Sequence, residues 1–267
     1  MAAIEQQRRW QTRNEADLTP ETLQALFDNE IPLIRIQFAT RDECDALAHS
    51  LGRFEDMVRM KNVESPAAYV GVNLIAYRQG EDRKDEYFAA VPAAVERQQS
   101  IFARAFDPYR RMIERLTEVN PAGANTAVEE GYGEYCPIII RHASGGLHLH
   151  CDFAPYNSPN WSVGKIDAQI TWNLYVQEAK SGGETTVHNF AWTPPPGETE
   201  LAQRGLPGDL PDGVESITFA PTQGDVVFFN SRNPHSVGAG VAEEGHNRIS
   251  AGSFVGRQAD GTLVSWA

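Results

Sequence analysis

The first half of the chain spaces its apolar residues in two ways, and the helical spacing comes first. Apolar residues recur every three or four positions after Thr19-Pro20, after Thr40 and over residues 86–120. This spacing places them on one side of a helix. Proline at the first helical position and a Thr-x-x-Glu capping box mark the starts of the first two helices. Asp107-Pro108 divides the third segment into two helices.

The other spacing predicts strands. Residues 31–38 and 68–77 are apolar, rich in β-formers and lie between these helices. Beyond residue 127 nearly all apolar runs are of this short kind, separated by Gly, Pro and Asn. These runs cover residues 134–142, 145–152, 167–176, 183–190, 215–220, 225–230 and 247–256. About seven short strands at this spacing predict an antiparallel sandwich or barrel.

The pattern therefore predicts a single domain over residues 1–267, with an all-β core and flanking α-helices, an α+β chain. Residues 1–126 form a support region of helices and strands, and residues 127–267 form the core. A proline-rich segment, residues 192–213, interrupts the strands. A connection this long is either a lid or an inert surface insertion. We expect a lid, because the segment follows a strand that should line the barrel.

Composition narrows the kinds of partner. The 267 residues carry a net charge of −13, whereas nucleic acids and anionic membranes attract cationic surfaces. No apolar run is long enough to span a bilayer, and the N-terminus has no signal-peptide pattern. Three cysteines are too few for a disulfide framework. We expect a cytoplasmic protein that acts on a small molecule; a homodimer is compatible with the sequence but not indicated by it.

Candidate metal ligands lie in the second half. His150 and Asp152 are two positions apart on a predicted strand, so both side chains point to one side while Cys151 points away. His235 follows the strand at 224–229. Two imidazoles and one carboxylate, with coordination positions left open, are the ligand set of non-haem iron(II) oxygenases.

A candidate anion site follows 13 residues after His235. Arg248 and Ser250 are again two positions apart on a predicted strand. A guanidinium fork beside a hydroxyl group suits a planar carboxylate.

Together, His150-x-Asp152, His235 and Arg248-x-Ser250 resemble the Fe(II)/2-oxoglutarate-dependent dioxygenase family over residues 134–255. Gly182-Gly183-Glu184-Thr185 and the Gly224-Asp225 that leads into His235 resemble it too. More weakly, the chain is similar to free-standing small-molecule hydroxylases related to aliphatic halogenases.

The resemblance implies a double-stranded β-helix, or jelly roll, buttressed by N-terminal helices. It further implies that His150, Asp152 and His235 hold Fe(II), and that Arg248 and Ser250 hold the distal carboxylate of 2-oxoglutarate. The implied reaction uses dioxygen to hydroxylate an unactivated C–H bond of an amino acid, an amino-acid derivative or a natural product, releasing succinate and CO2. Halogenases of this type replace the carboxylate ligand with a small residue. Because this chain keeps Asp152, hydroxylation is favoured over halogenation.

Other residues are candidates for substrate contact. Thr171, Asn173 and Tyr175 alternate with apolar residues, so one face of their strand is polar. That face looks either into the barrel toward a ligand or out to solvent. Leu147 and His148, just before the first metal ligand, are the remaining substrate candidates. Arg141 and His142 end an apolar strand, where either could reach the cosubstrate; of the two roles, we expect a capping or surface role.

Two other classes of protein compete with this interpretation. His148-x-His150 also resembles the opening of the metal motif in cupin-like isomerases, but that motif requires a Glu where this chain has Ala154 and Pro155. A non-catalytic binding protein on a jelly-roll scaffold is the second alternative. Within the oxygenase class, a halogenating or desaturating outcome stays open.

Overall fold

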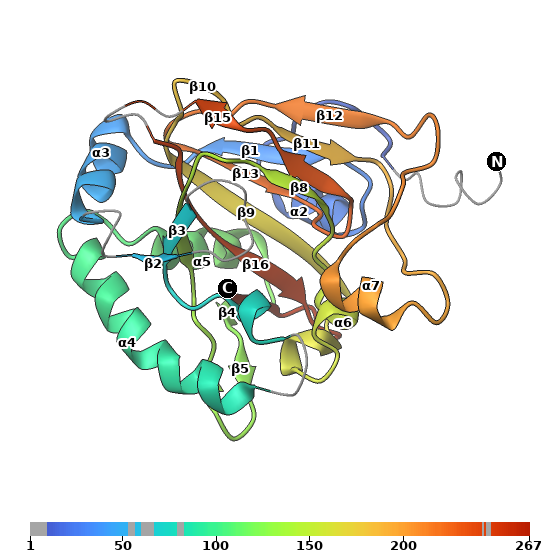
Figure 1. Ribbon diagram of the computed structural model, residues 1–267, viewed down its shortest axis with the longest axis horizontal. Coiled ribbons are helices and arrows are strands. Elements are labelled where there is room, and N and C mark those ends of the chain that lie inside the picture. The colour runs from blue at the N-terminus through green and yellow to red at the C-terminus, as the bar shows by residue number, and fades with distance from the viewer. Residues whose placement is uncertain (1–9, 53–56, 60–66, 79–82, 242, 244–246) are drawn as a thin grey trace.

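The computed structural model describes residues 10–52, 57–59, 67–78, 83–241, 243 and 247–267 (Figure 1). Four helices precede the strands of the second half. They are α2 (Pro20–Phe27), α3 (Arg41–Ser50), α4 (Lys84–Phe102) and α5 (Pro108–Val119). The predicted starts are confirmed, because Thr19 and Thr40 both cap their helices through reciprocal capping boxes and Asp107 caps α5. Helix α4 continues through Pro92.

A nine-stranded sheet forms the larger layer. Its main path runs β1-β13-β9-β16-β7-β3-β2, and β17 and β4 extend it from β16. The bounds are β1 (Leu33–Gln37), β2 (Val58–Arg59), β3 (Ala67–Val70), β4 (Ala124–Thr126), β7 (Ile139–Ala143), β9 (Ala168–Gln177), β13 (Asp225–Phe229), β16 (Ile249–Arg257) and β17 (Leu263–Trp266). All neighbours pair antiparallel except β17 and β4.

A four-stranded sheet faces the larger one across a pocket lined by strands of both. Its order is β12-β11-β14-β8. The bounds are β8 (Leu147–His150), β11 (Thr185–His188), β12 (Ser216–Phe219) and β14 (His235–Val237). Two short pairs complete the described strands: β5 (Val128–Glu129) with β6 (Gly133–Glu134), and β10 (Ser181–Gly182) with β15 (Gly240–Val241). The predicted jelly roll buttressed by N-terminal helices is confirmed.

Strand β9 shows how the sequence separates the core from the pocket. Ile170, Trp172 and Leu174 are fully buried in the core cluster that also contains Leu26 of α2 and Leu47 of α3. The residues between them, by strand alternation, face the other way. The helices therefore seal the outer face of the large sheet, and its inner face is left for the site.

One predicted strand is wrong in part. The apolar run 68–77 is a strand only to Val70, and residues 74–76 form the short 3-10 helix η2 (Leu74–Ala76). Gly71 stands at φ +129°, a conformation that side chains disfavour, and Asn73 then caps the turn through Ile75. The run bends at Gly71 and brings Asn73 and Ile75 to the pocket.

The proline-rich segment 192–213 carries the helix α7 (Thr199–Arg204), which packs against α6 (Ala154–Asn157) near the end of β8 (Figure 1). The short 3-10 helix η3 (Ser162–Lys165) also packs against α6. The amide of Cys151 donates to the carbonyl of Gly205, and Leu206 lines the pocket. The segment is therefore part of the pocket wall, and its action as a lid stays a prediction.

The three cysteines are free and buried. Among the described residues, no helix combines the length and the apolar character needed to cross a membrane.

Candidate active site

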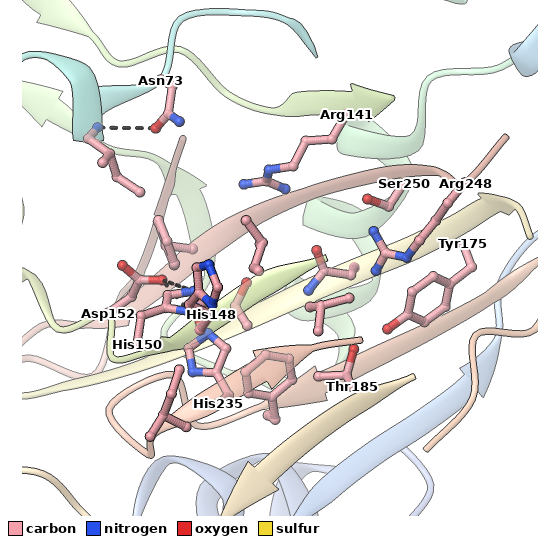
Figure 2. A pocket seen from close by; sticks show the side chains of 18 of the residues that line it. Asn73, Arg141, His148, His150, Asp152, Tyr175, Thr185, His235, Arg248 and Ser250 are labelled. Atoms are coloured by element: carbon pink, nitrogen blue, oxygen red, sulfur yellow. Dashed lines mark hydrogen bonds and ion pairs between the residues drawn. The ribbon is translucent and has the colours of Figure 1, made fainter. Parts of the chain in front are cut away.

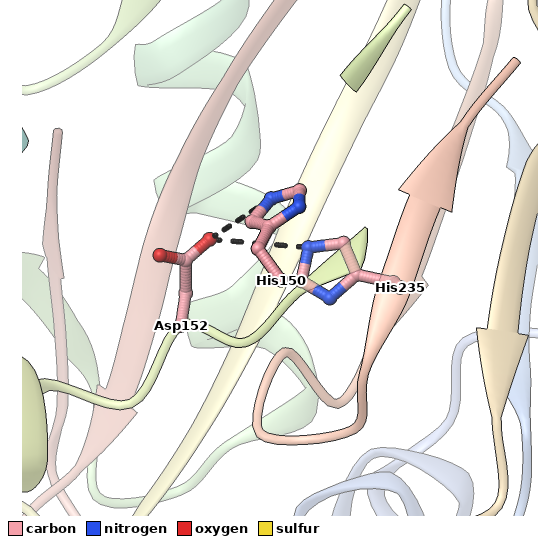
Figure 3. Close-up of side chains that lie close together, drawn as sticks. All are labelled: His150, Asp152 and His235. Carbon is pink, nitrogen blue, oxygen red and sulfur yellow. Dashed lines mark ion pairs between the residues drawn. The ribbon is translucent and has the colours of Figure 1, made fainter. Parts of the chain in front are cut away.

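Three predicted ligands meet at one end of the pocket (Figure 3). His150 is the last residue of β8, and His235 is the first of β14. The two are direct partners in the antiparallel pair, and Asp152 follows two residues after His150. Asp152 Oδ2 lies 3.6 Å from Nε2 of His150 and 3.9 Å from Nε2 of His235. The side chains predicted to share a metal do converge.

Backbone carbonyls fix the orientation of both imidazoles. Nδ1 of His150 donates to the carbonyl of His148 at 2.7 Å, and Nδ1 of His235 donates to the carbonyl of Asn233 at 2.9 Å. With the proton held on Nδ1, the Nε2 lone pair of each ring points toward Asp152, as a metal ligand requires. Each partner lies two residues upstream of its histidine, and no sequence pattern predicts either contact.

Asp152 is held through its backbone and through its side chain. The amide of Asp152 donates to the carbonyl of Ser231, whose hydroxyl donates back to the Asp152 carbonyl at 2.9 Å. Its second carboxylate oxygen, Oδ1, lies 3.8 Å from the guanidinium of Arg78. One oxygen therefore faces the histidines and the other faces a cation.

Burial sets the charge of the cluster. Burial and, to a smaller extent, the neighbouring His150 lower the pKa of His235 to about 3. A neutral imidazole is the form that binds a metal. Two imidazole nitrogens and one carboxylate, mutually within 4.8 Å, fit a divalent transition metal that keeps positions open for other ligands.

Arg248 and Ser250 lie further along the same pocket (Figure 2). Arg248 is 8% exposed, lies over the ring of Tyr175 at 5.6 Å, and its Nε has no hydrogen-bond partner. Gly183 makes room for it, because a Cβ at that position would lie 3.1 Å from Cδ of Arg248. A buried guanidinium with unused donors fits a carboxylate ligand.

The substrate candidates all line this pocket, a cavity of about 320 Å³. Leu147 and His148 come from β8, and Thr171, Asn173 and Tyr175 come from the inner face of β9. The polar face of β9 thus looks into the barrel and not to solvent.

One expectation about the pocket is wrong. We expected a capping or surface role for Arg141, but this residue lines the pocket and its guanidinium points into it (Figure 2). Arg141 is opposite Ser250 in the β7–β16 register, so both side chains leave the sheet on the pocket side.

Sequence reasoning also missed Arg78, Asn73 and Thr185. Thr185 was within reach, since it ends the Gly-Gly-Glu-Thr string and begins β11. Arg78 and Asn73 follow the bend at Gly71, where no periodic pattern signals direction.

A family model described as "Carrier-protein-independent halogenase WelO5" matches residues 12–264. The chain belongs to this family. The match spans the support region and the β-core together, in agreement with the resemblance to iron(II)/2-oxoglutarate oxygenases that the sequence showed. The prediction that the chain is an enzyme of the 2-oxoglutarate-dependent dioxygenase class is confirmed, and the predicted cofactors agree with the candidate metal site.

Individual relatives agree with this family. The chain is 29% identical over 244 residues to the L-gamma-glutamyl-L-propargylglycine hydroxylase of Streptantibioticus cattleyicolor, covering 86% of this chain and 85% of that protein. It is also 29% identical over 202 residues to the leucinostatins biosynthesis cluster protein S of Purpureocillium lilacinum, covering 73% and 82%.

Among solved structures, an N-substituted L-amino acid dioxygenase from Burkholderia ambifaria superposes with a TM-score of 0.62 at 18% identity, covering 93% of this chain and 91% of that one. The same dioxygenase in complex with α-ketoglutarate superposes equally well. These similarities establish the shared fold.

Proposed function

We propose that this protein hydroxylates an unactivated C–H bond of a small molecule, an amino acid or amino-acid derivative, in a reaction that consumes 2-oxoglutarate and dioxygen. One observation carries the proposal: the carboxylate of Asp152 converges with His150 and His235 in the wall of a pocket. The relatives named as an L-gamma-glutamyl-L-propargylglycine hydroxylase and an N-substituted L-amino acid dioxygenase support the substrate class.

Each predicted residue has a place in this proposal. His150, Asp152 and His235 would hold Fe(II), and Arg248 and Ser250 would hold the distal carboxylate of 2-oxoglutarate. When bound, Fe(II) and 2-oxoglutarate would activate dioxygen, so that one oxygen atom enters the substrate C–H bond and the other enters succinate as CO2 is released.

The residues of the pocket would orient the bound molecules and exclude water. The β9 face orients the bound molecules, with Tyr175 under Arg248 at the cosubstrate end and Thr171 and Asn173 nearer the substrate. Phe229, Leu206 and Val237 line the apolar part and exclude water. A cavity of about 320 Å³ is the size of a small-molecule site.

Hydroxylation is proposed over halogenation because Asp152 occupies the ligand position that a halide would need. The family name keeps halogenation as the second candidate. We further propose that the protein acts in the reducing cytoplasm, as three free buried cysteines suggest. Homodimer formation remains a prediction.

The test begins with anaerobic protein, Fe(II) and 2-oxoglutarate. We expect a weak visible charge-transfer band; well-folded, iron-loaded protein without that band would end the proposal. A panel of amino acids and N-acyl amino acids, screened in air with chloride present, should then release succinate. Product mass separates the outcomes: an added oxygen supports hydroxylation, whereas an added chlorine supports halogenation.

A further inference from the structure

One charged group in the pocket has no hydrogen-bond or ion-pair partner among the described residues. The side chain of Arg141 makes no hydrogen bond or ion pair with any residue that the structure describes. Its guanidinium points into the pocket, between the His–Asp–His cluster and Arg248 in the view of Figure 2. Burial lowers the pKa of Arg141 to about 10, so the group remains a cation at neutral pH. Placing an unpaired charge there costs free energy that a folded chain normally avoids.

The charges around the site indicate the charge of the ligand that it would bind. Arg78, Arg141 and Arg248 place three guanidinium groups in or beside the pocket, and Asp152 is the one carboxylate among the described residues that line it. A divalent metal and dianionic 2-oxoglutarate cancel each other in formal charge. The loaded pocket therefore stays positive, and an anion is still lacking.

The residues around Arg141 indicate which other features a matching ligand has. Asn73 lines the same pocket, and its side-chain oxygen accepts from the amide of Ile75, which leaves its NH2 group free to donate. Apolar walls complete the space, formed by Ile75, Leu147, Leu149, Leu206, Val237 and Phe254. A ligand that matches has one carboxylate and an apolar body.

We propose that Arg141 binds a carboxylate of the substrate, so that this enzyme acts on small carboxylic acids with an apolar side chain, such as N-acyl amino acids. The inference rests on the proposed function and narrows its substrate class. Arg248 and Arg141 then divide two tasks: the first holds the cosubstrate and the second holds the substrate.

The test compares acids with their uncharged amides. The probes are N-acetyl-L-leucine, N-acetyl-L-valine and N-acetyl-L-phenylalanine, each beside its carboxamide. Binding is measured anaerobically as a shift of the visible band of the Fe(II)–2-oxoglutarate complex, and turnover as succinate release. For wild type we expect at least one acid to bind about tenfold or more tightly than its amide, the loss typical of a charge-assisted contact.

Variants at position 141 assign the effect. Arg141→Gln should remove the preference for the acid while leaving the Kd for 2-oxoglutarate within about twofold, and Arg141→Lys should restore part of the preference. Amides that bind as well as acids, or no acid that binds, would overturn the proposal. So would an Arg141→Gln variant that loses 2-oxoglutarate affinity. If wild type lacks the band altogether, the proposed function itself fails, which is a different result.

A second measurement needs no substrate. In the protein loaded with Fe(II) and 2-oxoglutarate, Arg141→Met should raise Tm by about 2–4 °C, because it removes an unpaired charge from the pocket. The control is Arg111→Met on α5, which removes a guanidinium 2.6 Å from Glu43 and should lower Tm. An equal fall in both variants would show that Arg141 serves the fold and would overturn the proposal.

Discussion

The arginines of the helical buttress and those of the pocket differ in what satisfies them. On α5, Arg111 lies 2.6 Å from the carboxylate of Glu43 and donates to the carbonyl of Phe38. In the pocket, burial lowers the pKa of Arg248 and of Arg141. The buttress satisfies its charges within the chain, whereas the pocket leaves its charges for molecules that the chain binds.

The largest effect in this comparison should come from the pocket carboxylate. Asp152→Ala removes one of three candidate ligands, so we expect Fe(II) affinity and succinate release to fall by roughly 100-fold or more. The fold should persist, because the backbone contacts of Asp152 with Ser231 remain. An iron titration measures the Fe(II) affinity, and circular dichroism shows whether the fold persists.

Asp167→Ala is the matched control. Asp167 is exposed, pairs with Arg257 at 2.9 Å and is not among the residues that line the pocket. We expect wild-type turnover from this variant. Wild-type iron affinity in Asp152→Ala would contradict the assignment of Asp152 as a ligand.

The next effect concerns Arg248, the residue just before β16. Arg248→Ala should raise the 2-oxoglutarate concentration needed for half-maximal turnover by roughly 10- to 100-fold, since a charge-assisted contact is worth about 1.5–3 kcal/mol. Arg257→Ala, at the far end of β16 and paired with Asp28 and Asp167, is the control and should leave that concentration unchanged. An unchanged requirement in Arg248→Ala would move the cosubstrate anchor elsewhere in the pocket.

A smaller effect tests whether the proline-rich segment supports the site. Gly205 ends α7 at φ +66°, and a Cβ there would overlap the carbonyl oxygen of Cys151, which lies between two candidate ligands. Gly205→Ala should therefore weaken Fe(II) binding by roughly threefold to tenfold, as expected for an overpacked neighbour that costs about 1 kcal/mol.

Gly208→Ala provides the comparison, because Gly208 has φ +67° and a Cβ at this position would have no atom within 4 Å. Both variants carry the same backbone strain, so only the contact with Cys151 differs. Equal iron affinity in the two variants would show that segment 192–213 does not position the ligands.

The same contrast explains how much the sequence could predict. In the buttress, capping boxes at Thr19 and Thr40 and the alternation of β9 follow local rules, so helix starts and the buried face were predictable. The ligand cluster was predictable because residue types and spacing carry its chemistry. Arg78 and Arg141 were not, since their role depends on which groups the fold brings near them, and that requires long-range geometry. The bend at Gly71 was hidden within an apolar run for the same reason.

The smallest expected effect belongs to the satisfied pair of the buttress. Arg111 and then the Thr40 amide, which donates to the Glu43 carboxylate, lower the pKa of Glu43 from 4.5 to about 2. The folded state therefore favours the charged form, so this stabilisation is complete above pH 4.5 and is lost as the pH falls toward 2. Because the pair is partly solvent-exposed, Glu43→Gln should cost only about 0.5–1 kcal/mol at pH 7. Urea unfolding of both proteins between pH 6 and pH 3 measures the difference, which should be constant above pH 4.5 and shrink below it. A difference independent of pH would mean that the charge of Glu43 contributes nothing to stability, and the buttress would then owe nothing to its ion pair.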